Sequence, residues 1–182
     1  MLVKILWQND VSLQLLLIPG WRDRQVDQVE DIVYLPTCWI LEKRTVIEKM
    51  TAAVLYGKQD VRIERVSIPS IEDDDVLLRI KVALTCGTDA KVYRRGYHAR
   101  MIVPPAVFGH ELAGEIAAVG RNVQDFHAGM RVVAANSAPC GTCFYCRRDQ
   151  ENLCENLIFI NGAYAEYICI PGQVVRQNLL PI

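Results

Sequence analysis

The sequence predicts a mainly β fold with short helices, and three features of the chain favour this fold class. Hydrophobic residues make up 51% of the 182 residues, enough to bury the core of one ordinary domain with an appendage. Beyond Met50, short alternating or branched apolar runs are separated by turn residues, the pattern of a barrel or sandwich of small strands. Ten of the eleven glycines lie in this part of the chain and punctuate the runs.

The strands are expected in order along this second part. At 61–66 apolar and charged residues alternate with a period close to two, so one face can pack inward while the other meets water. The expected strands cover residues 52–56, 61–66, 76–84, 112–119, 131–134 and 164–170.

The first 49 residues differ in composition from the rest of the chain. They contain all three tryptophans and show neither a clean period nor repeats. Pro19 and Pro36 would interrupt any long helix there. We interpret residues 1–49 as an N-terminal extension of uncertain structure and residues 50–182 as the domain, with Met50 as its natural start. An ordered helical arm packed on the domain is the alternative.

Charge and hydropathy exclude two classes of partner. Twenty Lys and Arg residues against 21 Asp and Glu give a formal charge of −1, without the basic stripe that nucleic acid requires. No apolar stretch approaches the roughly 18 residues of a membrane-spanning helix. Asn9 and Asp10 interrupt the early apolar region, which argues against a signal peptide. We therefore expect a cytoplasmic protein with neither nucleic-acid nor membrane partners.

Four of the seven cysteines lie within fifteen residues, as Cys140-x2-Cys143-x2-Cys146-x7-Cys154. Four thiolates suit tetrahedral zinc, and their closed shell leaves no position for substrate, so the role would be structural. Disulfides are disfavoured by a reducing compartment and by the two-residue gaps. An iron–sulfur cluster shares the first spacings, but the last gap is seven residues and no proline follows Cys154. A nucleic-acid zinc ribbon would need basic surroundings.

A second group of metal ligands is of a different kind. The sequence CGTD at 86–89 ends one expected strand, and GHE at 109–111 begins another. Cys86, His110 and Glu111 supply thiolate, imidazole and carboxylate, and a zinc site of two or three side chains keeps an open position for chemistry. The Thr88 hydroxyl can relay the proton of a bound alcohol, and Asp89 can accept the free ring N–H of His110. Taken singly, such residues are more often structural.

Together and in this order, these motifs resemble the zinc signature of the medium-chain alcohol dehydrogenase family. The resemblance covers residues 50–182. It is carried by CGTD at 86–89, GHELAGE at 109–115, the four-cysteine segment and GAYAEY at 162–167. CGTD and NLCEN at 152–156 look like the sorbitol and threonine dehydrogenase branch. Met130 departs from the family, which usually has aspartate in that turn.

The resemblance implies a GroES-like β-barrel with a protruding zinc-binding loop. It implies two zinc ions, a catalytic one held by Cys86 and His110 with Glu111 as ligand or near-ligand, and a structural one held by the four cysteines. Thr88 would be the proton relay and Asp89 the residue that orients His110. The implied activity is NAD- or NADP-dependent oxidation of a small-molecule secondary alcohol, a polyol or an amino alcohol.

The Rossmann domain that completes such an enzyme is absent from the sequence, because no G-x-G-x-x-G motif occurs in the 182 residues. We therefore expect a catalytic-domain fragment, cut off before the nucleotide-binding domain and inactive alone. The complete enzyme is expected to be a homo-oligomer. The alternative is a non-catalytic zinc-binding module or relic subunit that lacks cofactor binding.

Overall fold

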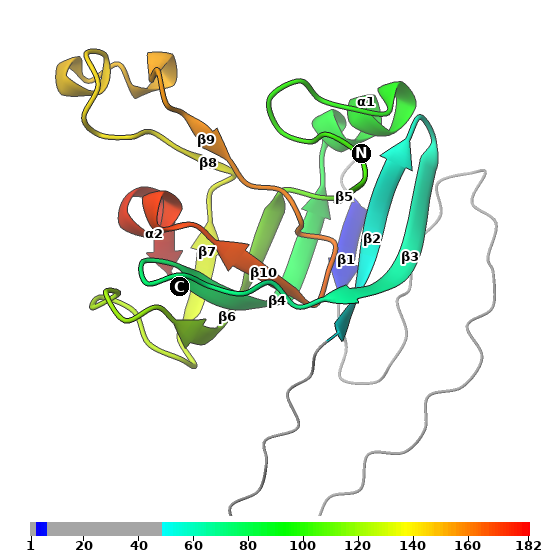
Figure 1. Cartoon of the computed structure of the whole chain (residues 1–182), viewed down its shortest axis with the longest axis horizontal. Coiled ribbons are helices and arrows are strands. Elements are labelled where there is room, and N and C mark those ends of the chain that lie inside the picture. Colours follow the sequence, from blue (N-terminus) through cyan, green and yellow to red (C-terminus); the bar gives the residue numbers. More distant parts are fainter. Residues whose placement is uncertain (1–2, 7–48) are drawn as a thin grey trace, which may run out of the picture.

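The structure is a computed structural model that describes residues 3–6 and 49–182. Within these residues the strands form three separate sheets, and both α-helices are short (Figure 1). Among the described residues no helix is long and apolar enough to cross a membrane.

The largest sheet is built around two long antiparallel strands, β4 (Val76–Thr85) and β6 (Glu111–Val119). Alternate apolar side chains face the core, where Leu78 and Ile116 are fully buried. The sheet is completed by β1 (Val3–Leu6), β7 (Arg131–Ala134), β10 (Tyr167–Ile170) and β11 (Leu179–Pro181). Its strand order is β1-β4-β6-β7-β11, with β10 also beside β4.

A smaller sheet contains β2 (Lys49–Gly57), β3 (Asp60–Ser67) and β5 (Ala106–Val107) in the order β3-β2-β5. The backbone just before β10 connects it to the large sheet, because the N–H of Ala53 donates to the carbonyl of Tyr164 at 2.8 Å. The isolated bridge between Ala52 and Ala165 lies beside this bond. Strand β2 is therefore held close to the start of β10.

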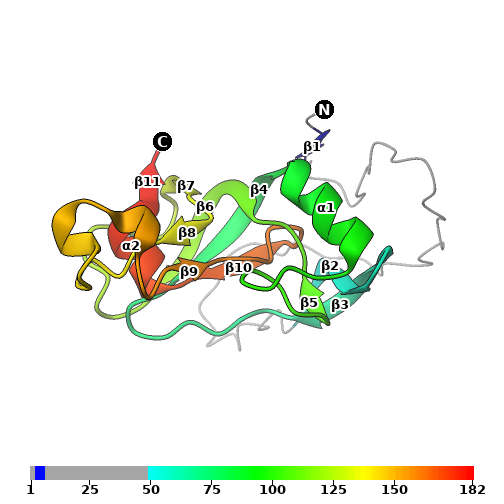
Figure 2. The same cartoon turned by 90° about the horizontal axis from the view of Figure 1, so that it is seen from above.

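The helices and a protruding lobe lie at the edges of the sheets. Helix α1 (Gly87–Arg95) follows β4 directly, and α2 (Gly172–Asn178) follows β10. The lobe is the segment between β8 (Ser137–Ala138) and β9 (Ile158–Phe159) and contains the short helices η1 (Cys146–Arg148) and η2 (Glu151–Leu153). Seen from above, the lobe and α1 lie at opposite ends of the molecule (Figure 2).

The predicted fold class is confirmed, since the described residues form mostly strands with short helices. Five of the six expected strands begin and end within three residues of β2, β3, β4, β6 and β7, and the one at 131–134 matches β7 at both ends. The sixth begins at Tyr167 rather than at residue 164. Strand β1 was not among the expected strands. Residues 7–48 lie outside the described residues, so the interpretation of residues 1–49 as an extension stays a prediction.

Candidate metal centres

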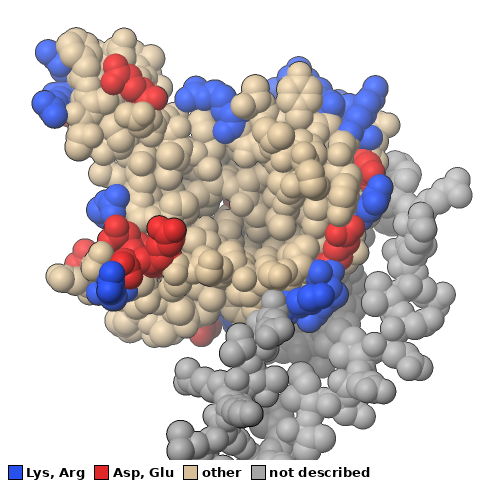
Figure 3. Space-filling model, in the orientation of Figure 1, with Lys and Arg blue, Asp and Glu red and all other residues tan. Residues whose placement is uncertain are grey.

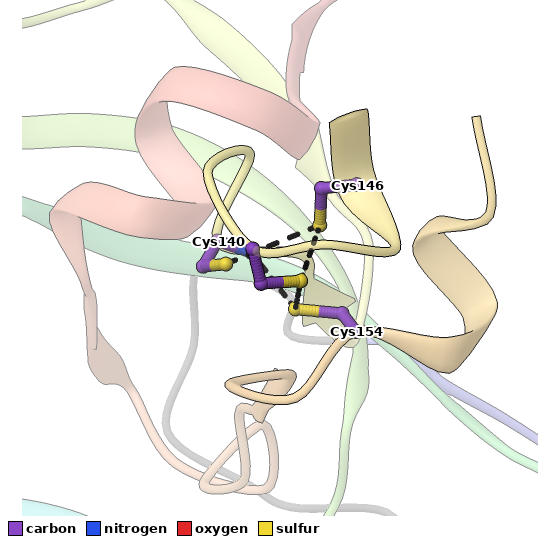
Figure 4. Close-up of side chains that lie close together, drawn as sticks. Cys140, Cys146 and Cys154 are labelled. Atoms are coloured by element: carbon purple, nitrogen blue, oxygen red, sulfur yellow. Dashed lines mark hydrogen bonds between the residues drawn. The ribbon is translucent and has the colours of Figure 1, made fainter. Parts of the chain in front are cut away.

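The four cysteines of the lobe converge on one point (Figure 4). The Sγ atoms of Cys143 and Cys146 lie 3.5 Å apart, and those of Cys140 and Cys146 lie 4.0 Å apart. Cys154 completes the group, with its Sγ 4.0 Å from that of Cys143. All four cysteines are free thiols in this arrangement.

The chemistry of this donor set fits a zinc ion. Tetrahedral zinc with bonds of about 2.3 Å places neighbouring sulfur atoms about 3.8 Å apart, close to the spacing found here. A disulfide would need about 2.05 Å. The backbone N–H of Thr142 lowers the pKa of Cys140 to about 6, whereas burial raises the pKa of Cys146 to about 12. A bound cation would favour the thiolate form of all four and remove their mutual repulsion.

The lobe has little apolar interior of its own. Cys146 and Cys154 are buried, while Phe144 and Leu153 are more than half exposed. The Arg148 guanidinium lies over the exposed ring of Phe144, 3.7 Å from the ring centroid. A bound metal ion would therefore replace a hydrophobic core in holding this segment together.

The second site begins where β4 meets α1. Cys86 is the N-cap of α1, and its Sγ accepts a hydrogen bond from the backbone N–H of Thr88 at 3.2 Å. Asp89 returns the interaction, because its Oδ2 accepts the backbone N–H of Cys86 at 2.9 Å. This capping box fixes the position of both side chains at the end of the strand.

His110 comes from the residue before β6 and meets the capping box from the other side. Its Nε2 lies 3.3 Å from Sγ of Cys86, and its Nδ1 lies 3.2 Å from Oδ1 of Asp89. His110 and Asp89 are 3% and 2% exposed. A tetrahedral zinc ion bound by one sulfur and one imidazole nitrogen places these atoms about 3.6 Å apart, so the pair fits zinc with a small adjustment.

Asp89 is better placed to orient His110 than to bind metal, because both of its oxygens face protein groups. Its interaction with His110 raises the pKa of His110 to about 9, against the opposing effect of burial. Burial would raise the pKa of Asp89, but the hydrogen bonds from His110 and the Cys86 backbone outweigh it and lower that pKa. In the metal-free protein the two residues therefore form a buried ion pair.

Two predicted site residues, Glu111 and Thr88, are not among the three side chains whose ligand atoms come together. The ligand atoms of Cys86, Asp89 and His110 all lie within 4.8 Å of one another, and Glu111 is not part of that group. Thr88 is partly buried in the first turn of α1 and contacts Cys86 through its backbone N–H. The roles of Glu111 as a ligand and Thr88 as a relay stay predictions.

Sequence reasoning gave no role to Tyr164, which the structure places beside this site. Its hydroxyl lies 3.1 Å from the carbonyl oxygen of Leu84 and 2.9 Å from Oγ1 of Thr85, immediately before Cys86. The motif GAYAEY at 162–167 and the expected strand at 164–170 pointed to this segment but not to a role for the tyrosine.

An apolar hollow of about 440 Å³ lies beside the second site, and His110 contributes to its wall. The rest of the wall comes from β4, β6, β7 and the two residues after β7, and it includes Val82, Leu84 and Val133. On the face drawn in Figure 3, Lys and Arg form small separate groups around an uncharged centre.

Comparison with known proteins identifies the family to which the chain belongs. The family profile described as the alcohol dehydrogenase GroES-like domain matches residues 72–180, which include both candidate metal centres. The chain belongs to this family. The predicted resemblance is therefore confirmed.

Curated members of the family that resemble the chain include dehydrogenases of a polyol and of an amino acid. The chain is 37% identical over 130 residues to sorbitol dehydrogenase of Bacillus subtilis, covering 68% of this chain and 37% of that protein. It is 34% identical over 143 residues to L-threonine 3-dehydrogenase of Rhizobium johnstonii, covering 75% and 40% respectively. The chain thus spans about two fifths of the length of these relatives.

Solved structures of alcohol dehydrogenases share the fold. The enzyme TADH from Thermus sp. ATN1 superimposes with a TM-score of 0.64 at 34% identity, covering 73% of this chain and 40% of that one. A cobalt- and zinc-bound alcohol dehydrogenase from Pyrobaculum aerophilum gives 0.63 at 26% identity, covering 73% and 41%.

Proposed function

We propose that the chain is the zinc-binding catalytic part of an NAD- or NADP-dependent dehydrogenase that oxidises a secondary alcohol by hydride transfer. The observation that carries the proposal is the open pair of Cys86 and His110, backed by Asp89 and bordered by an apolar hollow. The four-thiolate centre offers no open position, so it would serve structure alone. Polyols and amino alcohols are the proposed substrates, in line with the sorbitol and threonine dehydrogenases among the relatives.

The residues of the second site have separable tasks in this proposal. Zinc bound there would lower the pKa of an alcohol hydroxyl and act as a Lewis acid. Asp89 holds the Nδ1–H of His110, so that Nε2, once it loses its proton, would offer its lone pair to an ion beside Cys86. Thr88 would relay the alcohol proton toward solvent. Glu111, the first residue of β6, would be a further zinc ligand or near-ligand. The apolar wall limits access of water to His110.

The nicotinamide cofactor requires a binding site separate from the two candidate metal centres. The 182 residues contain no G-x-G-x-x-G loop, whose glycines and helix N-terminus hold a pyrophosphate. We propose that a nucleotide-binding domain supplies it in the complete enzyme, which would be a cytoplasmic homo-oligomer. The missing motif equally favours a second candidate, a zinc-binding module without catalysis.

A fusion experiment separates the two candidates. The nucleotide-binding domain of a sorbitol or threonine dehydrogenase is joined after Ile182, and NAD and NADP reduction is followed with sorbitol, threonine and simple secondary alcohols. Catalysis predicts turnover that Cys86→Ala abolishes and Cys169→Ala, in β10, preserves. Zinc binding at both centres with background turnover from every fusion would favour the non-catalytic module.

A further inference from the structure

Tyr164 connects the two chain segments that carry Cys86 and His110. Its hydroxyl reaches the end of β4 at Leu84 and Thr85, the two residues before Cys86. Its ring lies against Gly109, the residue before His110. One side chain therefore contacts the neighbours of both candidate ligands, which are 24 residues apart in the sequence.

The hydroxyl of Tyr164 fixes the end of β4 through two polar groups. A carbonyl oxygen can only accept, so the Tyr164 O–H donates to Leu84, and the Thr85 hydroxyl is then free to donate to Tyr164. Burial raises the pKa of Tyr164, which keeps this proton in place at any physiological pH. Thr85 directly precedes Cys86, so the position of Thr85 determines where the chain leaves β4 and enters the N-cap of α1.

The ring of Tyr164 fixes the approach to His110. Gly109 has a φ of +89°, and a Cβ built on it would lie 2.5 Å from the nearest ring atom of Tyr164. The ring also meets Phe108 edge to face, with centroids 5.5 Å apart. Only a glycine can place the backbone this close to the ring with this φ.

The backbone of Tyr164 is itself anchored at the same place. Its N–H donates to the carbonyl of Phe108 at 2.8 Å, and its carbonyl accepts the N–H of Ala53 at 2.8 Å. The N–H groups of Gly162 and Ala163 donate to the carbonyl of Gly109 at 2.7 and 2.9 Å. The side chain thus extends from a fixed base next to His110 across to Thr85.

We propose that Tyr164 is a positioning residue of the second metal centre: its hydroxyl and ring together set the separation of Cys86 and His110. The inference rests on the proposed function, because it assigns a metal ion to that pair. Groups that orient metal ligands typically change affinity 10- to 100-fold when they are removed. Loss of the Tyr164 hydroxyl should therefore weaken metal binding there about tenfold, without affecting the four-cysteine centre.

Cobalt provides the test in the full 182-residue chain. Zinc is retained in the lobe, the second centre is emptied, and Co²⁺ is titrated while thiolate-to-cobalt absorption is recorded. Tyr164→Phe and Thr85→Val should each weaken binding about tenfold and shift the cobalt d–d bands. The double variant should be no weaker than Tyr164→Phe alone, because Tyr164→Phe already removes the bond to Thr85 that Thr85→Val removes. Tyr167→Phe is the matched control, and it should behave as wild type.

The outcomes separate the inference from the proposed function. Cobalt affinity and spectrum unchanged by Tyr164→Phe would overturn the positioning role. Failure of the wild type to bind cobalt through Cys86 would instead contradict the proposed function. The positioning role is then decided in metal-free protein by the amide NMR signals of Cys86 and His110. Shifted signals with reduced exchange protection in Tyr164→Phe support it, and unchanged signals overturn it.

Discussion

Oδ1 of Asp89 faces Nδ1 of His110 at 3.2 Å, and both side chains are almost completely buried. Oδ2 of the same carboxylate accepts the backbone N–H of Cys86 at 2.9 Å. One carboxylate therefore orients both members of the candidate catalytic zinc pair.

Replacing Asp89 by asparagine should weaken metal binding at the second centre 10- to 100-fold. The amide keeps the size of the side chain but has no negative charge to hold the Nδ1–H of His110. Cobalt titration of protein with a zinc-loaded lobe measures the loss. Asp125→Asn, at an exposed position in the β6–β7 turn, is the control. Equal affinity in wild type and Asp89→Asn would show that the carboxylate does not orient the ligand.

The metal-free protein should lose stability as pH rises toward 10. The folded pKa of His110 is raised to about 9, so its pairing with Asp89 contributes fully below the unfolded value of about 6.5. The contribution disappears as pH rises through about 9, with a loss on the order of 1 to 3 kcal/mol. Urea unfolding with chelator present, at pH 6 to 10, measures it. The same pH dependence in Asp89→Asn would exclude the pair as its cause.

Cys146→Ser should remove about one zinc equivalent and unfold the lobe. The remaining three thiolates hold the ion less tightly, and the segment has no apolar core to replace it. Metal analysis and hydrogen exchange across residues 139–157 report the two effects, and local destabilisation of several kcal/mol is expected. Cys169→Ser should retain both metals. Zinc content equal to the parent in Cys146→Ser would contradict the four-cysteine assignment.

A mild chelator should remove zinc from the second centre before the lobe. Four thiolates enclose the ion in the lobe, whereas Cys86 and His110 leave it partly open even with help from Glu111. Thiol labelling followed by mass spectrometry during the titration identifies which cysteines become reactive. Cys86 should react first, and simultaneous exposure of Cys86 and Cys140 would count against two distinct sites.

The 182-residue chain alone should neither bind NAD saturably nor oxidise alcohols with both zinc sites filled. Hydride transfer needs the nicotinamide held about 3 to 3.5 Å from the carbinol carbon, and free cofactor forfeits an effective molarity equivalent to roughly 7 to 11 kcal/mol. Calorimetry with NAD and NADP checks binding. Steady turnover that survives Cys86→Ala would refute the assigned chemistry.

Much of the fold could be predicted because its long strands bury one face. A period-two pattern identified β3 to within one residue at each end, since alternation directly reports burial. Strands β5, β8 and β9 have two residues each, too few to show any period. Helix α1 was not expected, because its N-cap is Cys86 rather than the usual serine, threonine, aspartate or asparagine.

The metal ligands could be proposed from the sequence because their side-chain chemistry is rare and their spacing is specific. Tyr164 could not, since its bonds to Leu84 and Thr85 span 80 and 79 residues and tyrosine has many structural roles. Its importance depends on tertiary distances alone. The close contact between Gly109 and the Tyr164 ring could not be predicted from the sequence for the same reason.

Two features of the structure act on the charge of the Cys86 sulfur. It accepts the N–H of Thr88 and lies at the N-terminus of α1, where the helix dipole is positive. Both influences draw electron density away from a thiolate and stabilise its negative charge. Such a sulfur donates less charge to a bound cation, so the cation keeps more of its own. An ion bound at this centre would therefore attract the oxygen of an alcohol more strongly than one held by a thiolate without this cap.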